Sequence, residues 1–367
     1  MQYLSKIIVG DYRNIALTEL EFSPNVNCIS GNNGEGKTNL LDAIYYLSMT
    51  KSAFATSEKH NFRFGTDSFS ISGNYVMNDG MVSRFAVKVD SGGEKKLRRD
   101  DKSYGRISEH IGILPVVMVS PADTQLVSES GEERRRFANA VLSQVDAAYL
   151  ADIQQYNRLL VQRNRLLKEQ SPDLGLLSVL AERMSLYGNA VYQRRKKFAA
   201  SLEPLLAKYY ELISGGKEEV GISYTSDLDR ASLADILESH RERDLAVGYT
   251  TAGIQRDDFL FTLGGYAIRA CGSQGQQKSF LVALKFAQYE LMRQEYGFAP
   301  MLLLDDVFDK LDPGRISNLL SLVAGNDFGQ IFITDSNKVR MRAIVDRITE
   351  DRTYYEAVGG RFQKAEA

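Results

Sequence analysis

A glycine-rich run between an apolar segment and a helical segment constrains the fold of this chain more than any other feature. Residues 31–38 read Gly-Asn-Asn-Gly-Glu-Gly-Lys-Thr, which is the G-x-x-x-x-G-K-[ST] pattern of a phosphate-binding loop. In such a loop the glycines let backbone N–H groups approach phosphate oxygens, the lysine contacts the outer phosphates and the hydroxyl binds Mg²⁺. Residues 26–30 predict a buried strand before the loop, and residues 39–47 predict a helix after it. The pattern therefore predicts an α/β domain that binds a nucleoside triphosphate.

We expect the nucleotide to be contacted by the loop and by two residues outside it, Asn39 in the helix that follows and Arg13 near the N-terminus. The complete set of expected contacts is Gly31, Asn32, Asn33, Gly34, Glu35, Gly36, Lys37, Thr38, Asn39 and Arg13. Lys37 is also expected to act in catalysis, because its charge lies beside the reacting phosphate.

A second element, residues 301–306, follows the pattern of an apolar strand that ends in two carboxylates. A buried parallel strand delivers such carboxylates to the sheet edge where phosphate and magnesium lie. We expect Asp305 to hold Mg²⁺ together with Thr38, and Gln125, which follows an apolar strand at 116–119, to be a further magnesium contact. Asp306 occupies the place of the hydrolytic base, where glutamate is usual, and its shorter side chain predicts slow turnover. Alone, the Asp pair also fits an N-cap of the next helix.

The third element is Ser273-Gln-Gly275-Gln276, followed by helical periodicity over residues 276–292. It resembles the signature of ATP-binding-cassette ATPases, which caps the ATP of a second subunit from a helix N-terminus. Ser273, Gly275 and Gln276 are therefore candidate nucleotide contacts in an ATP-gated dimer. So short a pattern by itself equally fits a turn before a helix.

Two further positions belong to the same architecture. Residues 309–312 resemble the D-loop that crosses a dimer seam. Thr334, at the end of an apolar strand over 330–334, occupies the place where many cassette ATPases have a catalytic histidine. We expect Thr334 to take part in catalysis and the missing histidine to slow hydrolysis.

Composition limits the classes of function. With 367 residues, 44% of them hydrophobic, the chain can bury a large core and divide into two lobes. A net charge of −2 excludes a general polycation, so any DNA contact requires local basic patches. The two cysteines are far apart, which indicates a reducing compartment and no zinc site. The sequence has neither a signal-like N-terminus nor a long apolar run, and we expect a cytoplasmic protein.

The periodicity changes along the chain and predicts the domain organisation. Residues 1–125 are rich in strands, including a hairpin of 69–77 with 82–89, whereas the basic run 95–99 fits a solvated loop. Residues 126–245 are mostly helical, with one long helix near 177–209. Residues 246–367 hold the signature, the acidic strand and the D-loop, and are expected to complete the ATPase lobe begun by 1–125.

Clusters of basic residues in the helical region predict a surface that faces DNA, since phosphate contacts require lysine and arginine. Any one cluster also fits an ordinary solvated helix face. The candidate DNA-binding residues are Arg134, Arg135, Arg163, Arg165, Arg194, Arg195, Lys196 and Lys197.

Several segments together resemble the RecF family of bacterial recombination mediators, which are relatives of the SMC ATPases. The segments that carry the resemblance are residues 12–14, 38–45, 120–123, 134–137, 156–157, 162–168, 256–259, 273–278 and 303–307. The chain departs from the family pattern at Gly253-Ile-Gln255, where that pattern has Gly-Pro-His.

The resemblance implies an ABC-type, SMC-like P-loop ATPase lobe of α/β class with a mostly helical second lobe. It implies ATP and Mg²⁺ as cofactors, a weak DNA-dependent ATPase, and a homodimer on double-stranded DNA near single-strand/double-strand junctions. It also implies partnership with RecR, and often RecO, in placing RecA on gaps.

Three other functions share part of this pattern. A transporter ATPase has a much shorter distance between the phosphate loop and the signature than Lys37 to Ser273, and an SMC-like break-repair ATPase needs a long coiled coil that this chain lacks. A nucleotide-gated DNA clamp in which hydrolysis is incidental stays open, because Asp306 and Thr334 both fit it.

Overall fold

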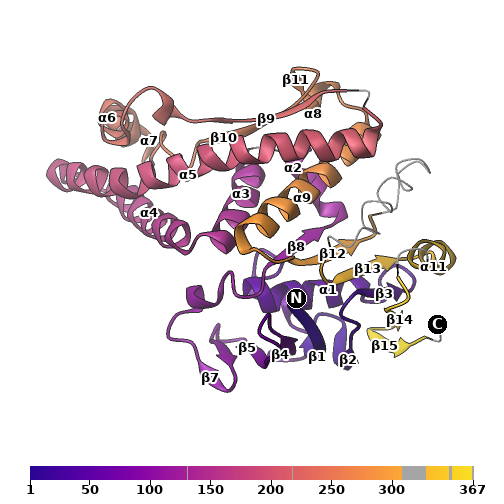
Figure 1. Ribbon diagram of the computed structural model, residues 1–367. Coiled ribbons are helices and arrows are strands. Elements are labelled where there is room, and N and C mark those ends of the chain that lie inside the picture. The colour runs from indigo at the N-terminus through magenta and orange to yellow at the C-terminus, as the bar shows by residue number, and fades with distance from the viewer. Residues whose placement is uncertain (130, 217, 308–327, 347–348, 366–367) are drawn as a thin grey trace. The chain divides into compact units, whose positions relative to one another are not determined.

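The chain folds into two compact units (Figure 1). The computed structural model describes residues 1–129, 131–216, 218–307, 328–346 and 349–365. The first unit comprises Met1–Asp123, Leu212–Ser214 and Val282–Ala367, and the second comprises Thr124–Glu211 and Gly215–Leu281. The first unit contains the phosphate loop and the acidic strand, and the second contains the signature.

The nucleotide-binding edge of the first unit belongs to a six-stranded sheet with the order β15-β14-β3-β13-β12-β8. All neighbouring strands are parallel except β14 and β15, which pair antiparallel. Every residue of β3, β13, β12 and the edge strand β8 is buried, as their largely apolar runs predict. The strands are β3 (Val26–Ser30), β8 (Val116–Val119), β12 (Met301–Asp305), β13 (Ile331–Asp335), β14 (Arg352–Val358) and β15 (Arg361–Lys364).

A second six-stranded sheet of the first unit is antiparallel, with the order β2-β1-β4-β5-β6-β7. Its β4 and β5 form the predicted hairpin, with Phe69 opposite Val89. The strands are β1 (Tyr3–Tyr12), β2 (Ile15–Glu21), β4 (Ser68–Val76), β5 (Val82–Asp90), β6 (Lys95–Arg99) and β7 (Lys102–Ser103).

The prediction of a solvated loop at 95–99 is wrong. These residues form β6, which pairs with β5 and places Leu97 opposite Val87. Leu97 is buried while its basic neighbours reach solvent, and β6 is paired on both sides, with β5 and with β7.

Helix α1 (Lys37–Met49) contacts strands of both sheets, which explains why ten of its thirteen residues are buried. Three short 3₁₀ turns, η1 (Glu58–Asn61), η2 (Ile107–His110) and η3 (Pro121–Thr124), and helix α11 (Lys338–Val345) complete the regular elements described around these sheets.

The second unit is mostly helical, as predicted. Its longest element, α5 (Leu174–Ser214), has 41 residues with Pro204 inside, and its last three residues belong to the first unit. The other helices are α2 (Gln125–Ser128), α3 (Gly131–Val145), α4 (Ala147–Leu166), α6 (Leu233–Ser239), α7 (Arg241–Val247) and α8 (Ile268–Cys271), with the short turn η4 (Asp227–Asp229). Helix α9 (Gln274–Tyr296) begins in this unit, and its residues from Val282 onward belong to the first unit. Figure 1 shows β9 and β10 alongside α5, where Phe198 packs edge-on against Phe259.

Three antiparallel strands in the order β11-β10-β9 cover this helical framework. They are β9 (Val220–Thr225), β10 (Asp258–Leu263) and β11 (Tyr266–Ala267). Because β10 pairs with β9 along its whole length, residues 246–281 group with the helical unit, whereas the sequence places them in the ATPase lobe. In the part of the chain that the structure describes, no helix has the length and apolar character needed to cross a membrane.

Candidate nucleotide site

The phosphate loop connects β3 to α1, and its glycines are required by its backbone. Gly31, Gly34 and Gly36 have φ values of 156°, 85° and 102°, in a region that other residues rarely adopt. A Cβ on Gly31 would lie 2.5 Å from the carbonyl oxygen of Ala357. Gly36 is the N-cap of α1, and glycine has no side chain that could cap the helix. The first backbone N–H groups of α1 therefore remain available to an anion.

Lys37 is held against the inner side of this loop. Its Nζ donates to the carbonyl oxygens of Gly31 at 2.8 Å and Asn32 at 3.0 Å, and the residue is only 4% exposed. Among the residues that the structure describes, no carboxylate lies within ion-pair distance of this ammonium. A buried charge whose partners are all neutral is suited to an added anion, and the triphosphate fits that requirement.

Three side chains meet at the carboxyl ends of β12 and β13. The Thr38 hydroxyl donates to both carboxylate oxygens of Asp305, at 3.0 and 2.9 Å, and the Thr334 hydroxyl donates to Oδ1 at 2.7 Å. Burial raises the pKa of the Asp305 carboxyl, and the hydrogen bonds from Thr334 and Thr38 oppose that shift. A hydroxyl beside a carboxylate is the oxygen donor set that Mg²⁺ prefers, so the residues present fit the metal.

Asp306 has an unusual backbone conformation directly after this cluster. Its φ is 46°, and its N–H group faces both the carbonyl oxygen and the hydroxyl of Thr334, at 3.3 and 3.2 Å. Its proposed action on the attacking water stays a prediction. The expected D-loop at 309–312 lies outside the described residues, as does most of the segment that would show whether Asp306 caps a helix.

Arg13 reaches the loop indirectly. Its guanidinium pairs with the buried Asp42 at 2.8 Å and donates to Oδ1 of Asn39 at 3.2 Å. The Asn39 amide in turn donates to Oδ1 of Asn14 at 2.7 Å, and Asn14 donates to the carbonyl oxygen of Gly34 at 3.2 Å. Arg13 and Asn39 therefore support the loop through Asn14, and their expected contact with nucleotide stays a prediction.

The β14–β15 turn contributes a part of the site that the sequence does not predict. The backbone N–H of Gly360 donates to the carbonyl oxygen of Glu35 at 3.0 Å, and that of Gly359 donates to the Glu35 carboxylate. The Gly-Gly pair predicts a turn, but nothing in the sequence indicates that this turn packs on a loop more than 300 residues earlier.

The signature occupies the start of α9 in the second unit. Ser273 and Gln276 cap the helix reciprocally: the Ser273 N–H donates to the Gln276 side chain at 2.6 Å, and the Gln276 N–H donates to the Ser273 hydroxyl at 3.3 Å. The Gln276 amide also donates to Glu218 at 2.6 Å. Ser273 is exposed and Gly275 is half-buried. Their contact with a nucleotide stays a prediction, as does the magnesium contact of Gln125, which is exposed in the second unit at the start of α2.

Three of the eight residues predicted to face DNA are instead buried inside the second unit, and for these the prediction is wrong. Each guanidinium is neutralised by an internal carboxylate, because a buried charge without a partner is costly. The pairs are Arg134 with Asp258 at 2.8 Å, Arg163 with Asp244 at 2.7 Å and Arg195 with Asp257 at 3.3 Å. Nothing in the sequence distinguishes these arginines from their exposed neighbours. Helical periodicity does not show which arginine will meet a buried carboxylate from a distant part of the chain.

The remaining five basic residues differ in what they contact. Arg165 and Lys197 are exposed and make no ion pair with any residue that the structure describes. Arg194 pairs with Asp146 and Asp152, Lys196 pairs with Asp229, and Arg135 donates to the carbonyl oxygen of Asp257.

Comparison with known proteins agrees with this geometry. Residues 3–353 match the family described as RecF/RecN/SMC N terminal domain. The DNA replication and repair protein RecF of Parabacteroides distasonis is 44% identical over 363 residues, covering 99% of both chains. The protein of the same name from Bacteroides fragilis strain NCTC 9343 is 42% identical over 364 residues, covering 99% of this chain and 98% of its own.

Solved structures show the same relationship. The recombination mediator RecF-ATP of the RecFOR pathway matches with a TM-score of 0.90 and 29% identity, covering 100% of this chain and 98% of its own. An Smc head domain from Pyrococcus furiosus shares only the fold, with a TM-score of 0.58 and 14% identity over 100% of this chain and 96% of its own. With its phosphate loop and its Thr38–Asp305 pair at the edge of a parallel sheet, the chain belongs to the RecF family of SMC-like, ABC-type ATPases.

Proposed function

We propose that this chain is an ATP-gated, DNA-binding ATPase of recombinational repair that dimerises on double-stranded DNA and hydrolyses ATP slowly. The observation that carries the proposal is the cluster of Lys37, Thr38 and Asp305. It unites a buried ammonium with neutral partners and a hydroxyl–carboxylate pair at one sheet edge. Such a cluster can bind a triphosphate and its metal together.

Each residue of the cluster has a distinct role in this proposal. The backbone N–H groups of the loop and Lys37 bind the phosphates and neutralise charge that develops during transfer. Thr38 and Asp305 would hold Mg²⁺, which supplies further positive charge beside the phosphates. Asp306 orients the attacking water, and Thr334 fixes the Asp305 carboxylate through its 2.7 Å hydrogen bond. A shorter base and a threonine at the histidine position both favour slow turnover.

The signature acts in trans in this proposal. Ser273 is exposed at the N-terminus of a 23-residue helix, where it can meet the γ-phosphate bound to a second copy. ATP would then bridge two chains, and its hydrolysis would release them.

The names of the relatives favour DNA repair. RecF of Parabacteroides distasonis is a DNA replication and repair protein, and the solved RecF is a recombination mediator of the RecFOR pathway. We therefore infer that this chain works in the cytoplasm near single-strand/double-strand junctions, with RecR and RecO, to help load RecA. Arg165 and Lys197, exposed and without an ion pair among the described residues, are the strongest candidates for phosphate contact.

Two measurements test the proposal. Sedimentation with ATP and Mg²⁺ should show dimers of the wild type, and Lys37→Met should abolish them without unfolding the chain. Steady-state hydrolysis should rise when duplex DNA is added. Equal dimerisation of Lys37→Met would contradict ATP gating, and hydrolysis that ignores DNA would favour the alternative of a nucleotide-gated clamp.

The DNA surface is tested by charge reversal. Arg165→Glu with Lys197→Glu should weaken duplex binding and reduce its dependence on salt. Lys196→Glu is the matched control, because Lys196 is already neutralised by Asp229 at 2.7 Å. Junction binding of the double variant that equals the wild type at every salt concentration would remove this surface from the proposal.

A further inference from the structure

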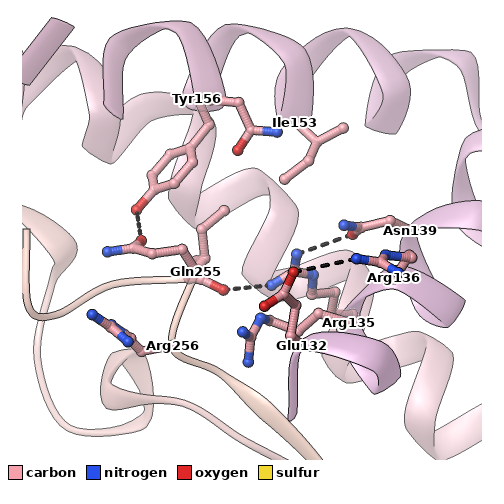
Figure 2. Close-up of a pocket in the computed structure, with 11 residues that line it drawn as sticks. Glu132, Arg135, Arg136, Asn139, Ile153, Tyr156, Gln255 and Arg256 are labelled. Atoms are coloured by element: carbon pink, nitrogen blue, oxygen red, sulfur yellow. Dashed lines mark hydrogen bonds and ion pairs between the residues drawn. The ribbon is translucent and has the colours of Figure 1, made fainter. Parts of the chain in front are cut away.

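The second unit contains an arginine-rich pocket of about 440 Å³ that has no part in the nucleotide site described above. Figure 2 shows Arg135, Arg136 and Asn139 on one side of it, Tyr156 and Ile153 on another, and Arg256 on a third. These groups come from α3, from α4 and from the segment between α7 and β10, respectively. Side chains from three elements therefore converge on one space.

The charge of the lining is strongly unbalanced. Four arginines line the pocket, and Glu132 is the one carboxylate among its lining residues. Glu132 is itself bound to Arg136, as Figure 2 shows. Arg195 is neutralised from behind by Asp257. Arg135 and Arg256 have no carboxylate within ion-pair distance among the described residues, so neither guanidinium is held in an ion pair at this pocket. Asp258, Glu132 and Asp257 act on Arg135 only from farther away.

The polar wall is rigidly built rather than a loose surface cluster. Arg195 is 2% exposed and donates to the carbonyl oxygen of Ile254 at 2.8 Å and to Oδ1 of Asn139 at 3.0 Å. Oδ1 of Asn139 also accepts the Tyr149 hydroxyl at 2.5 Å. Its amide nitrogen makes no hydrogen bond with a described residue, so it is a donor for a ligand.

The opposite wall is held in a similar way. The Tyr156 hydroxyl, on a fully buried residue, donates to Oε1 of Gln255 at 2.5 Å, and the Gln255 amide donates to the carbonyl oxygen of Ala252 at 2.7 Å. The Arg256 guanidinium lies 5.7 Å from the centre of the Tyr249 ring, a distance at which the ring stabilises and orients a cation.

Arg135 experiences this excess of positive charge directly. It is half-buried, and its one hydrogen bond to a described residue runs to the carbonyl oxygen of Asp257 at 2.6 Å. Burial and the nearby Arg195 lower the pKa of its guanidinium, and the carboxylates of Asp258, Glu132 and Asp257 offset this only in part. An anion bound in the pocket would stabilise the charged guanidinium and so offset both its burial and its repulsion by Arg195.

We propose that this pocket binds the phosphate group of a nucleotide unit, with Arg135 and Arg256 as its charged contacts and Asn139 as a neutral donor. Guanidinium forks pair with phosphate through two parallel hydrogen bonds, which a compact ammonium cannot do. The side chain of Ile153, which lines the pocket beside the cations, suits a sugar or base, and the volume lies within the range of small-ligand pockets. The same chemistry is offered by a free nucleotide and by a DNA strand.

The site is tested by calorimetry on the full chain carrying Lys37→Met, which removes the phosphate-loop lysine as a competing anion partner. Thymidine 5′-monophosphate should bind, inorganic phosphate should bind more weakly, and thymidine should not bind. Arg256→Ala should weaken the monophosphate by about tenfold, as expected for a lost charged hydrogen bond, and Arg256→Lys should restore part of the affinity.

Arg158→Ala is the matched control, because Arg158 is an exposed arginine of α4 beside the pocket residue Asn157 and does not itself line the pocket. Arg158→Ala should bind the monophosphate as tightly as the parent protein, which is the chain that carries Lys37→Met alone. Equal affinity in Arg256→Ala and the parent, or no binding by the parent, would overturn the proposal. Glutarate that binds as tightly as the monophosphate would also overturn it, in favour of a carboxylate site.

Two oligonucleotide arms identify the source of the phosphate. If the ligand is a strand terminus, a short single strand with a 5′-phosphate should bind more tightly than its unphosphorylated twin, and Arg256→Ala should abolish the difference. If the ligand is a free nucleotide, both strands should bind equally and neither should compete with the monophosphate. Both results support a phosphate site.

Discussion

At the scale of single residues, Asp305 determines how the site is organised. Its carboxylate is 3% exposed and accepts hydrogen bonds from Thr38 and Thr334. A buried carboxylate without donors is costly, so both hydroxyls stabilise the folded site as well as positioning a metal ligand. Thr334 thus has a structural reason to be present at a position that the sequence alone relates to catalysis.

Replacing Thr334 with valine should therefore weaken the fold even without nucleotide. Thr334→Val keeps the shape and removes a donor to a charged acceptor, and the free energy of unfolding should fall by about 1–3 kcal/mol. Thr334→Ser keeps the hydroxyl, so its free energy of unfolding should fall much less. Urea unfolding of the three proteins without ATP measures this. A valine variant as stable as the wild type would show that the 2.7 Å contact contributes nothing.

Asp306 can be tested without disturbing its backbone. Asparagine tolerates the left-handed conformation that a φ of 46° requires, so Asp306→Asn removes the charge and adds little strain. Hydrolysis should fall by about 100-fold or more, because the group that orients water is lost, while ATP binding is kept. Single-turnover hydrolysis and nucleotide titration separate the two effects. Wild-type hydrolysis by this variant would exclude Asp306 from the reaction.

His110 predicts how stability depends on pH. It is fully buried, one ring nitrogen faces the carbonyl oxygen of Leu47 and the other faces the Tyr104 hydroxyl at 3.1 Å. Burial lowers the pKa of His110 below its ordinary value of 6.5, so the folded state takes up a proton less readily than the unfolded state. Its contribution to stability is complete above pH 6.5 and is lost as the pH falls toward the lowered pKa.

The variant His110→Gln should be less stable at pH 8 but should lose less stability between pH 6.5 and 5 than the wild type. Chemical unfolding at several pH values checks this. Parallel curves for the two proteins would assign the acid sensitivity to other groups.

At the scale of elements, the sequence predicts those parts whose signal is local. The buried strands β3, β8 and β12, the hairpin of β4 with β5, and the long helix α5 all follow from periodicity over a few turns or residues. The contact of Thr38 with Asp305 follows as well, because parallel strands present their carboxyl ends at one edge.

The features that could not be predicted depend on contacts between distant segments. Arg195 looks like its neighbour Lys196 in the sequence, yet only Arg195 meets the buried Asp257. The placement of 246–281 depends on the pairing of β10 with β9. Support of the phosphate loop by the β14–β15 turn likewise joins opposite ends of the chain.

That turn offers a matched pair of substitutions. Gly359 and Gly360 both have positive φ, of 56° and 76°, so alanine costs conformational strain of about 1 kcal/mol at either position. A Cβ on Gly360 would also lie 2.2 Å from the carbonyl oxygen of Asn14, whereas a Cβ on Gly359 meets nothing within 4 Å.

Gly360→Ala should therefore lower both stability and ATP affinity more than Gly359→Ala does, because it displaces Asn14, which supports Gly34. Thermal unfolding and nucleotide titration of both variants are the measurements. If the two variants behave alike, the turn does not support the loop.

At the scale of the whole molecule, the phosphate loop and the signature belong to different units of the chain. In the proposed dimer each ATP lies between the Lys37 of one copy and the Ser273 of the other. Two complete sites then require two copies of the chain. A substitution at Lys37 damages the site that its own copy's phosphate loop forms, whereas a substitution at Ser273 damages the site on the partner's phosphate loop.

Mixing two defective variants tests this arrangement. Ser273→Arg should keep the ATP affinity of the monomer, because its own loop is intact, yet it should block closure by placing bulk and charge against the partner's nucleotide. Lys37→Met fails on the opposite side. In the mixture one composite site carries both lesions and the other carries none, so ATP-dependent association should partly return. Crosslinking across the mixed interface measures it, and normal ATP-dependent homodimers of Ser273→Arg would refute capping in trans.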